Sequence, residues 1–200
     1  MKVKYFGTKE EWLEARRGKI TGSTLKDIVV KRGTEEKVAF YQIIADTISQ
    51  KSEEDPLERG VRLEPEAVEL FSSKIGKEID TSLVLWQRDD NPLIAISPDG
   101  FIGDTEAVEV KCLSGARHIE SYLTNKIPDE YHYQVLQYFI VNEKLQTLYF
   151  VLYNPDMPEK IRLHYFTVNR EDIQTEVETY TTYQKEKLAK IQEIINQLTF

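Results

Sequence analysis

The hydrophobic and polar positions of this chain follow two different periods, which predict an ordered series of helices and strands. Helical spacing, together with capping residues, predicts helices over residues 8–17, 34–49, 55–75, 118–124, 129–141 and 170–198. A further short helix is expected after the first one and ends at about residue 30. Short apolar or alternating runs predict strands over residues 79–86, 93–96, 107–112, 146–154 and 160–168. This order predicts an α/β or α+β fold, with a central mixed β-sheet flanked by helices.

Several of the predicted helix ends carry recognisable capping residues. Thr8 and Glu11 have the spacing of a capping box. Asp55 precedes a proline at the first position of the third long helix, and Gly76 is expected to end that helix. Pro65 lies inside the same helix and removes a backbone hydrogen bond, so we expect a kink or a split near Glu64.

The chain shows no internal repeat, low-complexity tract or flexible linker, so we expect one domain over residues 1–200. Its core is expected to span about 5–172, with a C-terminal helix over about 170–198. Apolar residues make up 40% and charged residues 30%, which is typical of a globular protein. No apolar run is long enough for a membrane span, and the N-terminus lacks the apolar core of a signal peptide. We therefore expect a cytoplasmic protein.

The cysteine content and the charge limit the classes of protein to which this chain can belong. The single cysteine, Cys112, excludes an internal disulfide framework and an iron–sulfur cluster held by one chain. The net charge of −8 argues against nucleic acid as a partner, because phosphate binding usually needs a basic surface. However, residues 16–37 hold seven bases and three acids, which is either a solvated helical surface or a local basic rim.

Candidate chemistry is concentrated between Ile96 and Cys112. Glu109 and Lys111 are two residues apart on a predicted strand, so their side chains share one face, while Val108 and Val110 point to the core. Asp99 lies in the Pro-Asp-Gly turn that follows the preceding strand. If strands 93–96 and 107–112 pair as a hairpin, Asp99 returns to the Glu109 side.

Two carboxylates on one small face favour a hard divalent cation, to which the Val110 carbonyl can add an oxygen ligand. Lys111 beside them can hold a water or stabilise charge on a phosphate. Taken singly, a Glu-x-Lys triplet is more often a solvent-facing strand, and Pro-Asp-Gly is a common turn. The combination, with nine residues between Asp99 and Glu109, is more specific.

At this point the sequence resembles the PD-(D/E)xK nucleases, and within them the lambda exonuclease or YqaJ-type viral recombinase branch. A restriction-endonuclease-like core is therefore expected. The segments that carry the resemblance occur in the family's order and span roughly residues 5–172: WLEARRGKITGS (12–23), RGVRLEPEAVELF (59–71), ISPDG (96–100), VEVKC (108–112), YHYQVLQYFIV (131–141), YFVLYNPD (149–156) and LHYFTVNRED (163–172).

The resemblance implies a role for each matching residue. Asp99, Glu109 and the Val110 carbonyl would bind the metal, with Glu64 as a further acid of the site. Lys111 would be the catalytic lysine, and Gln134 would contact the lysine or the substrate. A pocket for a 5′-terminal phosphate would be formed by Arg16, Ser23, Ser97 and Gln134. Arg17 and Lys19 depart from the family's usual apolar residues and are additional candidates for DNA contact.

The resemblance also implies a function. We expect a Mg²⁺-dependent 5′→3′ exonuclease that degrades one strand from double-stranded DNA ends for phage-type recombination, with Mn²⁺ as a substitute. Its relatives form trimeric rings and work with a single-strand annealing protein. A ring would let an acidic protein stay on DNA with few phosphate contacts. The alternatives are an endonuclease or single-strand nuclease on the same fold, and a non-catalytic module that binds DNA ends or proteins.

Overall fold

The computed structural model describes residues 6–17, 33–49 and 55–199 of the chain. The described residues divide into two compact units, and both units are built from several separate segments of the chain. The first holds residues 1–67, 111–126 and 152–164, and the second holds 68–110, 127–151 and 165–200. The expected single domain over 1–200 remains a prediction.

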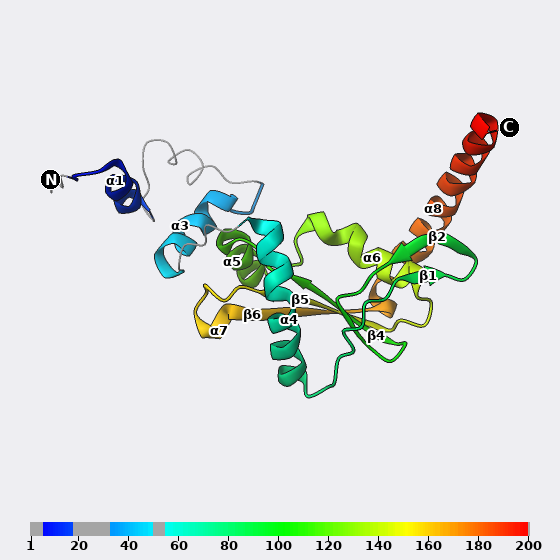
Figure 1. The fold of residues 1–200 in the computed structure, drawn as a ribbon, viewed down its shortest axis with the longest axis horizontal. Coiled ribbons are helices and arrows are strands. Elements are labelled where there is room, and N and C mark those ends of the chain that lie inside the picture. Colours follow the sequence, from blue (N-terminus) through cyan, green and yellow to red (C-terminus); the bar gives the residue numbers. More distant parts are fainter. Residues whose placement is uncertain (1–5, 18–32, 50–54, 200) are drawn as a thin grey trace. The chain divides into compact units, whose positions relative to one another are not determined.

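The elements follow the predicted order of helices and strands (Figure 1). The helices are α1 (Lys9–Arg16), α3 (Val38–Ile48), α4 (Pro56–Ile75), α5 (Gly115–Thr124), the 3₁₀ turn η1 (Asp129–Tyr131), α6 (His132–Val141), α7 (Glu159–Arg162) and α8 (Arg170–Thr199). The strands are β1 (Trp86–Arg88), β2 (Asn91–Ile96), β3 (Gly100–Ile102), β4 (Glu106–Lys111), β5 (Thr147–Tyr153) and β6 (Leu163–Asn169).

A four-stranded sheet with the order β3-β4-β5-β6 forms the centre of the fold, and β1 and β2 form a separate antiparallel pair. The mixed α+β architecture predicted from the sequence is confirmed. The central strands β4 and β5 are almost entirely buried, and the buried positions of β4 include Glu109.

Local capping agrees with the sequence. The Thr8 hydroxyl accepts a hydrogen bond from the Glu11 backbone N–H at 3.1 Å, and the Glu11 carboxylate accepts one from the Gly7 N–H at 3.0 Å. Gly76 follows α4 with a φ of +66°, as a helix-ending glycine should. Pro65 does not split α4, which continues from Pro56 to Ile75.

Three predicted elements differ from the structure. The strand expected over 79–86 begins only at Trp86, because the Asp80 carboxylate accepts the Ser82 N–H in a local turn at 2.8 Å. The first residues of the segment 160–168 complete the short helix α7 before β6 begins. The hairpin between strands 93–96 and 107–112, which the sequence left as a condition, does not form, because β2 pairs with β1 and β4 pairs with β3. The predicted helix ending near Val30 lies outside the described residues.

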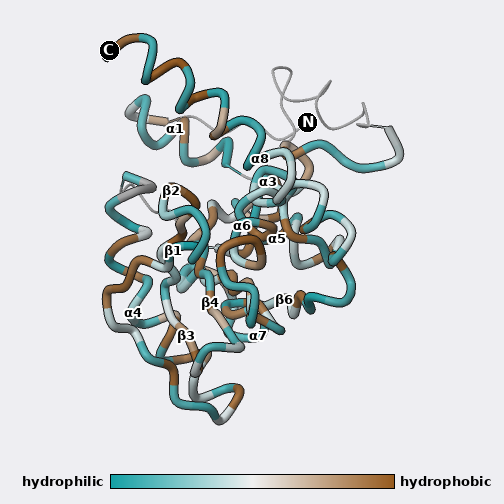
Figure 2. Tube along the Cα trace, turned by 90° about the vertical axis from the view of Figure 1, so that its right-hand side faces the viewer, coloured by the Kyte–Doolittle hydropathy of each residue, from teal (hydrophilic) through white to brown (hydrophobic). Residues whose placement is uncertain are grey.

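Each unit has its own packing. In the first unit, α3 packs against α5 around a buried cluster that includes Tyr41, Ala45, Ala116, Ile119 and Met157. In the second unit, α6 packs against α8 and the β1–β2 pair. Hydrophobic and hydrophilic residues alternate along α8, and its last turns are exposed (Figure 2).

Candidate active site

The β3–β4 hairpin fixes Asp99 against β4. The Asp99 backbone N–H donates to the Val108 carbonyl at 3.2 Å, and the Asp99 carboxylate accepts the Val110 N–H at 2.7 Å. Gly100 pairs with Val108 in the register of the hairpin. The sequence therefore places the turn aspartate beside the residue that follows Glu109, although through β3, a strand that the sequence did not predict.

Gly100 is required for this close approach. A Cβ atom built on Gly100 would lie 2.5 Å from the Ile79 side chain, which is shorter than any normal carbon–carbon contact. The glycine of the Pro-Asp-Gly turn thus has a packing reason.

Glu109 is a charged residue at a core position, since only 2% of it is exposed. The Gln134 amide donates to one carboxylate oxygen at 2.7 Å, and the Tyr138 hydroxyl donates to the other. Gln134 and Tyr138 are one turn apart on α6, so both reach the same strand residue. A buried carboxylate needs such hydrogen bonds, because desolvation would otherwise make its charge costly.

Tyr138 is a candidate site residue that the sequence analysis missed. It lies among apolar residues of α6 and is fully buried, and its ring packs edge-on against Trp86 at 6.5 Å between centroids. A buried tyrosine hydroxyl usually has a partner. Its position four residues after Gln134, on the same helix face, is the signal that could have identified it.

The donor set suits a divalent cation. Asp99, Glu109 and the Val110 carbonyl offer only oxygen atoms, which are the ligands of Mg²⁺ and similar hard cations. In an antiparallel pair the N–H and C=O of one residue point to the same neighbouring strand. The Val110 carbonyl therefore faces the edge at which Asp99 binds the Val110 N–H. In the described part of the chain, no group of three acidic, histidine or cysteine side chains is arranged to hold a metal.

The remaining predicted site residues are spread over both units. Lys111 ends β4 and belongs, with Glu64 on α4 and Arg16 on α1, to the first unit. Arg17 is half-buried, and its guanidinium donates to the Ser49 carbonyl at 2.9 Å and pairs with Asp46 at 3.6 Å. Lys19 and Ser23 lie outside the described residues.

Ser97 has a defined local partner. Its hydroxyl donates to the Val84 carbonyl at 2.7 Å, which ties the end of β2 to the segment that leads into β1. The side chain is exposed, so a phosphate contact remains a prediction for this residue.

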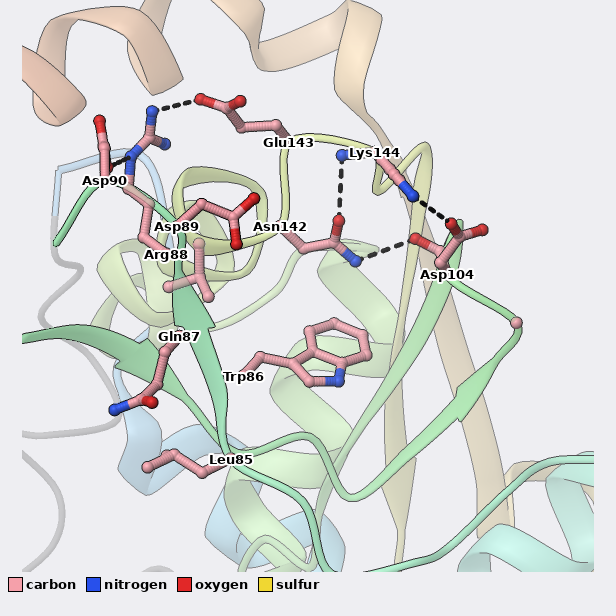
Figure 3. Close-up of a pocket in the computed structure, with 12 residues that line it drawn as sticks. Leu85, Trp86, Gln87, Arg88, Asp89, Asp90, Asp104, Asn142, Glu143 and Lys144 are labelled. Carbon is pink, nitrogen blue, oxygen red and sulfur yellow. Dashed lines mark hydrogen bonds and ion pairs between the residues drawn. The ribbon is translucent and has the colours of Figure 1, made fainter. Parts of the chain in front are cut away.

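A separate recess of about 560 Å³ lies in the second unit, lined by residues of β1 and of the loop after α6 (Figure 3). Residues that line the recess form ion pairs with each other: Arg88 pairs with Asp90 and Glu143, and Lys144 pairs with Asp104 at 2.9 Å. None of the predicted site residues lines it. We therefore assign it no part in the candidate site.

Solved structures similar to this chain are exonucleases. LHK-Exo in complex with dAMP is 27% identical with a TM-score of 0.61, and the match covers 95% of this chain and 98% of that one. The alkaline exonuclease LHK-Exo from Laribacter hongkongensis is 24% identical with a TM-score of 0.56, covering 96% and 100%, which supports the fold. No curated protein sequence matches this chain.

Fold and relatives together define a nuclease of the lambda exonuclease type, an enzyme that cleaves phosphodiester bonds. The model of the YqaJ-like viral recombinase domain matches residues 11–145, so the chain belongs to that family. The resemblance seen in the sequence is confirmed. Within the described ranges, none of the helices is both long and apolar enough to span a bilayer.

Proposed function

We propose that this protein is a Mg²⁺-dependent 5′→3′ exonuclease that degrades one strand from double-stranded DNA ends. The observation that supports this most directly is the 2.7 Å hydrogen bond from the Val110 N–H to the Asp99 carboxylate. It holds one acid against the strand that carries Glu109, at the spacing of the PD-(D/E)xK motif.

In this proposal Asp99, Glu109 and the Val110 carbonyl hold the cation, with Glu64 as a further candidate ligand. The bound cation supplies Lewis acidity for attack of water on the phosphodiester. Gln134 and Tyr138 orient Glu109 by donating to its two oxygens. Lys111 stabilises charge that develops on the phosphate. Mn²⁺ has the same preference for oxygen ligands and is expected to substitute.

The polarity rests on the proposed 5′-phosphate pocket of Arg16, Ser23, Ser97 and Gln134, with Arg17 and Lys19 as further DNA contacts. A guanidinium and hydroxyl donors suit a terminal phosphate. We further propose a trimeric ring and cooperation with a single-strand annealing protein. A ring that encloses the DNA would let a protein with a net charge of −8 stay bound, because enclosure reduces the number of phosphate contacts needed.

The test uses purified full-length protein, Mg²⁺, and three DNA substrates. We expect rapid degradation of linear duplex with 5′-phosphate ends, slower degradation of the same duplex with 5′-hydroxyl ends, and no cutting of closed circular duplex. Cutting of closed circles would identify an endonuclease instead. Equal rates with 5′-phosphate and 5′-hydroxyl ends would contradict the phosphate pocket. A native mass near three times the 23.3 kDa chain mass is expected for the ring, and a monomer mass would contradict it.

A further inference from the structure

Exposed aromatic side chains gather where α6 meets α8 in the second unit. Tyr133 is 64% exposed and Tyr183 is 54% exposed, whereas Tyr138 and Tyr153 are fully buried. A contiguous exposed apolar patch, rather than a single exposed side chain, often marks a site of interaction. We call His132, Tyr133, Tyr180 and Tyr183 the aromatic strip.

The strip is ordered by regular contacts between the two helices. The His132 ring nitrogen lies 3.0 Å from the Glu176 carboxylate, and the Gln184 amide donates to the Gln137 side-chain oxygen at 3.0 Å. Between these contacts the rings of Tyr133 and Tyr180 meet at 5.4 Å with an interplanar angle of 73°. This edge-to-face contact leaves ring faces open to solvent, in line with the exposure of Tyr133.

A cation lies at one end of the strip. Lys187 Nζ is 4.9 Å from the centre of the Tyr183 ring. Tyr180, Tyr183 and Lys187 follow each other at three and four residues, so they share one face of α8. The other end carries Glu176, whose carboxylate is engaged by His132. Ring faces beside an ammonium group match a ligand with flat bases and a phosphate backbone.

The strip lies next to the candidate active site. Tyr133 directly precedes Gln134, which donates to Glu109 at 2.7 Å. Consecutive residues share one turn of a helix, so Tyr133 lies on the same turn of α6 as Gln134. An exonuclease that removes one strand leaves the other strand unpaired close to its active site.

We propose that the aromatic strip binds the unpaired strand of the DNA substrate by stacking on its bases, with Lys187 contacting its backbone. The inference rests on the proposed function, because that function supplies the unpaired strand. Stacking on aromatic rings tolerates any base sequence, as an enzyme that degrades DNA of any sequence requires. With Lys187 as the cation of the strip, binding should depend only weakly on salt.

The experiment measures binding of a fluorescent dT₁₂ oligonucleotide in EDTA by anisotropy. Three folded variants are compared with the wild type: Tyr133→Ala/Tyr183→Ala, Tyr133→Phe/Tyr183→Phe, and Leu93→Ala. Leu93 is the matched control, because it is a large apolar residue of the same unit that is 66% exposed on β2. We expect the double alanine variant to bind about tenfold or more weakly, and the other two within about twofold of wild type.

A second measurement locates the contact. An oligonucleotide carrying 5-iododeoxyuridine should crosslink to a peptide that contains Tyr133 or Tyr183. Wild-type affinity in the double alanine variant, or crosslinks confined to other peptides, would overturn the proposal. The proposal would also be overturned if the double alanine variant had a lower native mass than the wild type but the same affinity for the oligonucleotide. The strip would then be a contact between copies of the chain.

Cleavage of linear duplex by the wild type is scored separately. One outcome is that the wild type does not cleave while the binding pattern holds: the double alanine variant binds weakly and the double phenylalanine variant binds normally. In that case the strip is a single-strand binding site and the proposed function is wrong. If the wild type cleaves and the pattern is absent, the proposed function stands and the strip fails.

Discussion

At the scale of single residues, the position of Glu109 carries the most chemical information. A carboxylate that is 2% exposed on a central strand would destabilise the fold unless hydrogen bonds offset its desolvation. Gln134 and Tyr138 supply those bonds, one to each oxygen. These hydrogen bonds hold Glu109 in place, as its proposed role as a metal ligand requires.

Tyr138→Phe should weaken metal binding about tenfold, because outer-sphere donors that orient a ligand typically account for 10–100-fold in affinity. Calorimetric titration with Mn²⁺ measures this directly, and the Mg²⁺ concentration for half-maximal cleavage should rise in parallel. Tyr153→Phe is the control: its hydroxyl also donates to a glutamate, Glu66 at 2.6 Å, but in the first unit. Unchanged Mn²⁺ affinity in Tyr138→Phe would refute the positioning role.

Sequence patterns predicted part of this site and missed part of it. The spacing of Asp99, Glu109 and Lys111 can be read from the chain, because a turn and a two-residue strand period fix which side chains share a face. Tyr138 could not be assigned in the same way. Its apolar neighbours indicate a core tyrosine, and only the packing of α6 over β4 reveals which partner its hydroxyl meets.

At the scale of elements, the β3–β4 hairpin positions Asp99. The sequence predicted β4 well, since Val108 and Val110 alternate with charged residues, but β3 has only three residues and no visible period. The predicted strand over 79–86 failed for a related reason. Its leucines suggest burial, yet Leu83 and Leu85 are exposed, so hydrophobicity alone misled the prediction.

Gly100→Ala should destabilise the protein by about 1–3 kcal/mol, because the new methyl group overlaps Ile79 and forces a backbone shift beside Asp99. Urea unfolding measures the loss. Gly60→Ala is the matched control: Gly60 lies within α4 with no atom within 4 Å of an added Cβ, so it should gain about 0.5–1 kcal/mol. Equal stability of both variants would contradict a close-packed hairpin turn.

Burial of His118 on α5 predicts that the stability of the fold depends on pH. Burial lowers the pKa of His118 below its ordinary value of 6.5, although its hydrogen bond with the Ile161 carbonyl at 2.6 Å acts the other way. The folded state thus holds the neutral ring. Stability is full above pH 6.5 and is lost as the pH falls from there through the folded pKa, because the unfolded chain takes up the proton more readily.

The slope of this loss is at most about 1.4 kcal/mol per pH unit, and His118→Asn should remove this component. Unfolding free energies of both proteins between pH 8 and pH 5 give the comparison. Parallel curves for wild type and variant would show that His118 does not contribute.

At the scale of the whole molecule, family membership, fold and acidic charge have to be consistent with one function. The chain is a YqaJ-family nuclease with a net charge of −8, so its net charge does not hold DNA to it. We infer that specific contacts do: the proposed metal site, the phosphate pocket and the aromatic strip. The sequence predicted the family and the mixed sheet. It could not predict how the side chains of α6 and α8 meet, because that depends on packing between distant segments.

The most direct test of the central claim is single-turnover release of the labelled 5′-terminal nucleotide from linear duplex. Wild-type protein and Asp99→Asn are compared over a range of Mg²⁺ concentrations, with circular dichroism confirming that both are folded. We predict Mg²⁺-dependent release by the wild type, and a rate about a thousandfold or more lower in Asp99→Asn, since a neutral amide binds a hard cation poorly. Release at the wild-type rate by Asp99→Asn, or equally fast release in EDTA, would contradict it.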